Sequence, residues 1–163
     1  MLKNLLLRQK TKSKDVSPTS CKSYQDTDEI GIVFHESIEE NDLQYLKNEL
    51  ANDCKNVSLM MRVDKFDKHK DYGYPYFFNR DVSFSGTLNS QFLQEFTVKE
   101  MDMLLILEND PDPLTSFVVS KCNAIKIGFF VEGSPIQHLD LLVKPKSESS
   151  KYQDLLSYIR KVA

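Results

Sequence analysis

The chain has few of the residues that form cross-linked folds and phosphate-binding loops. Its 163 residues include no tryptophan, five glycines and three cysteines. The cysteines are Cys21, Cys54 and Cys122, and no two of them form a Cys-x-x-Cys pair. This spacing argues against a disulfide framework and against a zinc site. We expect free thiols, with Cys54 and Cys122 packed inertly on the apolar sides of helices.

The glycines do not form any of the loops that hold a nucleotide. Neither Gly-x-Gly-x-x-Gly nor Gly-x-x-x-x-Gly-Lys occurs, and Gly31 falls inside a predicted strand instead of the turn after it. Gly-x-Ser-x-Gly is also absent, which argues against a serine hydrolase of the nucleophile-elbow type. We therefore expect no bound cofactor and no metal centre, and we favour a binding protein over an enzyme.

Long apolar runs are missing as well. No stretch reaches the roughly 18 apolar residues that span a bilayer. The opening residues contain only three consecutive leucines before Arg8, which is too short for the core of a signal peptide. We expect a cytoplasmic protein without a transmembrane segment.

Charge is divided unevenly along the chain. The first 14 residues carry five cations and no acid, so the net charge of -3 for the whole chain leaves -8 on the remainder. A basic arm on an acidic body predicts attachment to a polyanion such as RNA, a ribonucleoprotein or an acidic protein surface. A solvated tail, or a leucine stripe lying on a membrane or in a partner groove, are the alternatives. The cations are Lys3, Arg8, Lys10, Lys12 and Lys14.

The body alternates between short apolar runs and helical patterns. We predict an arm and linker over residues 1–23 and one domain over residues 24–163. Such alternation predicts a three-layer α/β sandwich with a mostly parallel, Rossmann-like sheet of about five strands. The predicted strands cover residues 29–34, 57–63, 103–107, 124–130 and 139–143. The last strand follows too short a connection for a helical crossover, so it either pairs antiparallel at an edge or is reached by an irregular loop.

Helix signals separate these strands. Ser37 and Glu40 have the spacing of a capping box, which predicts a helix running to about Asp53. Further apolar stripes predict helices near residues 88–96, 114–122 and 152–159. No internal repeat is present, and the oligomeric state is not predicted.

Polar residues follow the predicted strands at the edge where ligands bind in parallel sheets. His35 and Glu36 follow the first strand, Asp64 the second, and Asp110 comes soon after the third. A magnesium-binding or acid–base cluster for a phosphorylated or nucleotide-like ligand is the alternative that these residue types allow. The simpler interpretation is that the carboxylates favour a helix N-terminus and a turn.

A long aromatic loop over residues 64–86 is the other unusual feature. Its rings alternate with cations, a pattern that suits stacking on bases or binding a partner. The alternative is a plug whose rings pack against the body. The residues of interest in this loop are Tyr72, Tyr74, Tyr76, Phe77, Phe78 and Arg80.

Several segments resemble an uncharacterised family of small bacterial cytosolic α/β proteins, a domain of unknown function. They are the opening Leu2-Lys-Asn-Leu-Leu-Leu-Arg, the run Ile30-Gly-Ile-Val-Phe, the turn Tyr76-Phe-Phe-Asn-Arg-Asp, and the run Met103-Leu-Leu-Ile-Leu. This resemblance implies a fold and a compartment, and it implies no reaction.

Residues 102–129 also resemble part of the heptosyltransferase-type glycosyltransferase domains. There, too, a strand and a helix precede a Lys-Ile-Gly-Phe-like strand. The chain is too short for the two halves of such an enzyme, so this likeness implies architecture alone.

We therefore expect a non-catalytic α/β binding module tethered by its basic arm. A small enzyme or sensor that binds a phosphorylated or nucleotide-like ligand near His35, Glu36, Asp64 and Asp110 is the alternative.

Overall fold

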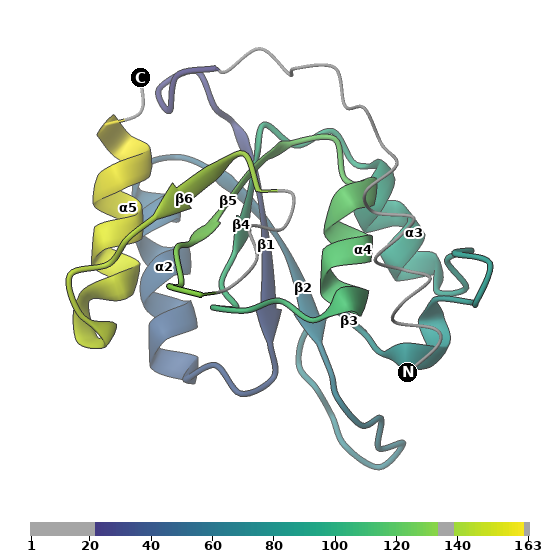
Figure 1. The fold of residues 1–163 in the computed structure, drawn as a ribbon. Helices are drawn as coiled ribbons and strands as arrows, with labels where there is room; N and C mark the ends of the chain where they lie inside the picture. Colours follow the sequence, from purple (N-terminus) through teal and green to yellow (C-terminus); the bar gives the residue numbers. More distant parts are fainter. Residues whose placement is uncertain (1–21, 134–138, 162–163) are drawn as a thin grey trace.

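A parallel sheet of six strands lies between two pairs of helices (Figure 1). The computed structural model describes residues 22–133 and 139–161. The strand order is β3-β2-β1-β4-β5-β6, and each pair of neighbouring strands in this sheet is parallel. The strands are β1 (Glu29–His35), β2 (Asn56–Arg62), β3 (Tyr76–Phe77), β4 (Met103–Ile106), β5 (Ile125–Phe129) and β6 (Leu141–Val143).

The two central strands are covered on both faces. The residues of β4 are all buried, as are the five inner residues of β1. Successive side chains of a strand point to opposite faces. Ile32 accordingly belongs to one core cluster and Val33 to the other. Burial on both faces explains why these strands appear in the sequence as unbroken apolar runs.

Two helices cover each face of the sheet, as Figure 1 shows. Helices α2 (Glu40–Asn52) and α5 (Lys151–Lys161) pack on one side, and α3 (Gln91–Val98) and α4 (Pro113–Lys121) on the other. In α2 the buried residues are Leu43, Leu46 and Leu50, spaced so that they share one face of the helix. The predicted three-layer α/β sandwich is confirmed.

Two predictions about the sheet are corrected. The last strand, β6, pairs parallel with β5, so the antiparallel alternative is wrong. The aromatic loop contains the two-residue strand β3, which pairs with β2 at the other edge. A two-residue strand has too short a pattern to be recognised from sequence.

The ends of α2 also differ from expectation. The helix begins at Glu40 after Glu39, and its N-cap makes no side-chain hydrogen bond, so the predicted capping box is wrong. The Ser37 side chain contacts His35 instead. Cys54 follows the helix with a positive φ of 59° and is exposed, so it is not packed as predicted, whereas Cys122 is buried.

Gly31 is explained by a close approach inside the sheet. A Cβ atom there would lie 2.5 Å from the sulfur of Met101 and 2.7 Å from a methyl carbon of Leu104. The glycine therefore serves packing in β1 and not a phosphate loop.

Candidate functional site

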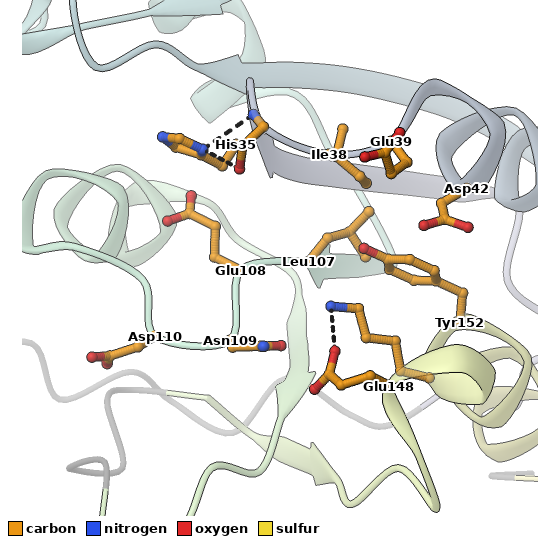
Figure 2. Close-up of a pocket in the computed structure, with 12 residues that line it drawn as sticks. His35, Ile38, Glu39, Asp42, Leu107, Glu108, Asn109, Asp110, Glu148 and Tyr152 are labelled. Carbon is orange, nitrogen blue, oxygen red and sulfur yellow. Dashed lines mark hydrogen bonds and ion pairs between the residues drawn. The ribbon is translucent and has the colours of Figure 1, made fainter.

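A crevice lies at the point where the order of the strands reverses. From β1 the chain proceeds outward through β2 and β3, and it then returns to place β4 on the other side of β1. The loops that leave β1 and β4 consequently diverge. In open parallel sheets this switch point, at the carboxyl ends of the strands, is where ligands bind. Here it holds a cavity of about 410 Å³ (Figure 2).

Three parts of the chain line this crevice. The β1–α2 connection and the start of α2 form one wall, the β4–α4 loop forms the second, and the segment entering α5 forms the third. Among the described residues, the lining includes five carboxylates, one lysine and one histidine. The lining residues are His35, Ser37, Ile38, Glu39, Asp42, Leu107, Glu108, Asn109, Asp110, Glu148, Lys151 and Tyr152.

The strand register brings His35 and Glu108 to neighbouring positions. Val33 of β1 pairs with Ile106, the last residue of β4, and His35 and Glu108 each lie two positions further along the chain. On the other side of β1, His35 pairs with Arg62 at the end of β2. The side chains at this edge therefore come from three adjacent strands.

His35 is held by hydrogen bonds at both ring nitrogens. The backbone N–H of Ser37 donates to Nδ1 at 3.2 Å, and the Ser37 hydroxyl lies 2.7 Å from the same atom. Nε2 lies 3.0 Å from a carboxylate oxygen of Asp64. Because Nδ1 accepts a backbone N–H, the proton of the neutral ring resides on Nε2 and points to Asp64.

Arg62 is the buried cation beside the crevice. Its side chain is 5% exposed and its Nη2 lies 2.9 Å from Asp112 and 3.8 Å from Asp64. Asp112 also caps α4 by accepting the Thr115 N–H at 2.7 Å. Burial opposes ionisation of Asp112, but this cap and Arg62 together hold its pKa below the ordinary value.

Glu108 has the most perturbed carboxyl group of the crevice. Its Oε1 accepts the Thr115 hydroxyl at 3.1 Å. Burial, and then the negative charge of Asp112, raise the pKa of Glu108 to about 7; Thr115, His35 and Arg62 oppose this shift. The group therefore exchanges its proton near neutral pH.

Three of the four predicted site residues lie together, and the fourth lies apart from them. His35, Glu36 and Asp64 have ligand atoms within 4.8 Å of one another. Asp110 lines the crevice but is not in this group.

The carboxylate of Glu36 already has partners inside this group. It accepts the Asp64 N–H at 2.9 Å and pairs with Lys70 at 3.0 Å. Burial opposes these two donors, which still hold the pKa of Glu36 below its ordinary value. We interpret the three residues as a hydrogen-bonded network that joins two strands and the aromatic loop.

The aromatic loop packs against the body through most of its rings. Phe77 is fully buried in the second core cluster, and Tyr72, Tyr74, Tyr76 and Phe78 pack against the first. Phe66 stacks on Phe78 with ring centroids 4.8 Å apart and remains 41% exposed. Arg80 is exposed, and its backbone carbonyl accepts a hydrogen bond from Asn89. These contacts favour the packed plug over a free stacking platform.

Sequence reasoning missed the wall contributed by α5 and the roles of Ser37, Arg62 and Asp112. Ser37 and Asp112 each resemble ordinary helix starts in the sequence, and Arg62 looks like the polar end of a strand. Glu108 had a visible signal, since it is the first polar residue after an apolar run. The predicted cations of the arm, from Lys3 to Lys14, lie outside the described residues.

Within residues 22–133 and 139–161, none of the helices has the length and apolar character needed to cross a membrane. Comparison with curated proteins found no match, and comparison with solved structures found none either. The glycosyltransferase likeness thus gains no support from a known structure.

One family model matches almost the whole chain. It covers residues 1–162 and is described as a family of unknown function, DUF6913. This agrees with the resemblance inferred from the apolar runs and turns. The chain, with its six-stranded parallel sheet and its acidic switch-point crevice, belongs to this family of unknown function.

Proposed function

We propose that the protein is an α/β binding module that holds a small, positively charged molecule in the switch-point crevice. The observation that carries this proposal is the coincidence of a cavity with the reversal of strand order. The volume of about 410 Å³ falls within the range of small-molecule sites.

The charge of the walls supports the choice of ligand. Glu39 and Asp42 lie on the α2 side, and Glu108 and Asp110 on the β4 side. Lys151, the lysine of the lining, lies 3.2 Å from Glu148, so its charge is balanced locally. The carboxylates attract and stabilise an amine or guanidinium group in such surroundings, whereas they repel a phosphate group. The lining therefore favours a cationic ligand over the phosphorylated or nucleotide-like ligand that was the alternative drawn from sequence.

Apolar surface between the acidic groups suits the carbon skeleton of such a ligand. In Figure 2, Ile38, Leu107 and the Tyr152 ring lie between Glu108 and the pair Glu39 and Asp42. Agmatine and 1,4-diaminobutane combine an aliphatic chain with terminal cations, so they are suitable probes. Glucose 6-phosphate and AMP are the matched anionic probes.

Thermal unfolding of the full chain tests this proposal. A cationic probe at about 100 times its Kd stabilises the folded state by about 2.7 kcal/mol, which raises Tm by roughly 5–10 °C. The double variant Glu39→Gln/Asp42→Asn should lose most of this shift. The control Glu95→Gln/Glu100→Gln removes the same charge from exposed positions outside the crevice and should retain it. A larger shift with the anionic probes would contradict the proposal.

We further propose that the basic arm, residues 1–23, attaches this module to RNA or to another polyanion. The uneven charge supports it, because the five cations of the first 14 residues precede a body of net charge -8. Lys22, where the described chain begins, pairs with Asp102 just before β4. It therefore lies at the amino end of the sheet, opposite the crevice, so the two functions need not compete.

Binding to single-stranded RNA at increasing salt concentration tests the arm. If all five cations contact phosphates, log K should fall against log salt with a slope of about -3.5. A chain lacking residues 1–14 should lose this binding, and replacement of Lys3, Arg8, Lys10, Lys12 and Lys14 by glutamine should do the same. Equal binding by the shortened chain would contradict attachment through the arm.

A further inference from the structure

We propose that Glu108 is a proton-exchanging group of the crevice, which releases its carboxyl proton when a cationic ligand binds. This inference rests on the proposed function and adds to it a residue, a chemical step and a dependence on pH. Binding would then respond to pH in the neutral range. Three features of Glu108 support this role: its position, its hydrogen-bond partners and the charges that face it.

The position of Glu108 supports this role. Glu108 follows the buried strand β4 by two residues and lines the cavity, and in Figure 2 its carboxyl group points toward His35. Its side chain is partly buried, unlike the exposed Asn109 and Asp110 that follow it. A carboxyl group just beyond the carboxyl end of a buried strand is partly desolvated and still within reach of a ligand.

The hydrogen bond from Thr115 engages one of the two carboxyl oxygens of Glu108. Thr115 donates its hydroxyl to Oε1, which orients the carboxyl group. The nearby guanidinium of Arg62 is held by Asp112, with two nitrogens of Arg62 at 2.9 and 3.3 Å from the same Asp112 oxygen. Arg62 is thereby committed to another carboxylate, and among residues 22–133 and 139–161 no cation forms an ion pair with Glu108.

The charges around Glu108 come from every element packed beside it. Asp112 of α4 repels its ionised form, while His35 of β1 and Arg62 of β2 favour it more weakly. Asp110 lies on the same loop as Glu108, and Lys151 of α5, paired with Glu148, lies on another wall of the cavity. Burial and the charge of Asp112 outweigh the opposing effect of His35 and Arg62, and the pKa of Glu108 in the protein without ligand is about 7.

A ligand cation in the cavity reverses this balance. The ammonium or guanidinium supplies the missing countercharge and stabilises the carboxylate, so the pKa of Glu108 falls. The O–H bond of the acid breaks, its proton passes to the buffer, and the resulting carboxylate pairs with the ligand. No electron is transferred, and no other reactant is needed.

Calorimetry of agmatine binding to the full chain tests the coupling. At pH 7 we expect about half a proton released per ligand, measured from the binding heats in two buffers of different ionisation enthalpy. The affinity should increase by about tenfold between pH 6 and pH 8. In Glu108→Gln the proton release and the tenfold increase should vanish. In the control Glu100→Gln both should remain.

The outcomes separate this inference from the proposed function. Agmatine binding without proton release, or with the same release in Glu108→Gln, overturns the role of Glu108 and leaves the binding function standing. If agmatine does not bind, the proposed function fails for this probe. The side-chain carbon signal of Glu108 in the free protein then decides: titration near pH 7 supports a proton-exchanging group, and an ordinary pKa near 4.5 overturns it.

Discussion

At the scale of single residues, Asp112 joins the stability of α4 to the electrostatics of the crevice. Its Oδ1 caps the helix and its Oδ2 receives Arg62. Its charge is also the second cause, after burial, of the raised pKa of Glu108. A change at this one position should therefore affect both folding and titration.

The substitution Asp112→Ala should lower the free energy of unfolding by about 2–4 kcal/mol. It removes a helix cap, worth about 1 kcal/mol, and leaves the buried Arg62 without its nearest carboxylate. Asp112→Asn keeps an oxygen for the cap and should cost less, about 1–2 kcal/mol. Urea unfolding measures both changes. Equal losses in the two variants would show that the cap contributes nothing, and no loss in Asp112→Asn would show that the charge of Asp112 does not matter to Arg62.

Glu108 should make the stability of the protein depend on pH. Its folded pKa of about 7 lies above the ordinary value of 4.5, so the unfolded chain loses this proton first as pH rises. Stability is therefore lost between pH 4.5 and 7, by on the order of 2–3 kcal/mol, and is constant above that window. Glu108→Gln should not show this loss. If the free energy of unfolding of the two proteins changed with pH in the same way, this would contradict the assigned burial of Glu108.

Among the site residues, those that follow long apolar runs were predictable. His35 and Asp64 come at or just after buried strands, and the parallel sheet brings them together. Asp110 lies two residues further into the loop than Glu108, and sequence alone does not show that the nearer carboxylate is the one with the raised pKa. Arg62 was missed because its burial depends on Asp112, fifty residues away in the chain.

At the scale of elements, apolar pattern predicts the strands and helices well where a core covers them. The central strands β1 and β4 and helix α2 were recognisable for this reason. The start of α2 was not, because Ser37 turns to His35 instead of capping the helix. The short strand β3 depends on pairing with β2, a tertiary contact that has no local signal.

Gly31 tests the packing of the central strand. Gly31→Ala places a methyl group against Met101 and Leu104, and it should destabilise the fold by about 1–3 kcal/mol. Shortening the obstructing side chain provides the control. The double variant Gly31→Ala/Met101→Ala should lose less stability than the sum of the two single losses, as measured by urea unfolding. Strict additivity would show that Met101 is not the obstacle.

At the scale of the whole molecule, the strand order determines where a ligand can bind. The sequence predicted a parallel α/β sheet, but the reversal between β1 and β4 comes from long-range pairing. The same folding step gathers carboxylates from three separate segments around one cavity. Their combined charge could not be seen in any local motif, which is why the alternative drawn from sequence was a phosphorylated or nucleotide-like ligand.

The most direct measurement is a titration of agmatine into the isotope-labelled full chain, followed by the backbone amide signals. Binding in the crevice predicts saturable shifts in residues 35–42 and 107–112, and little change when glucose 6-phosphate is added instead. Shifts confined to the aromatic loop, or shifts at the crevice caused by the phosphate and not by the amine, would contradict a cation-binding switch point.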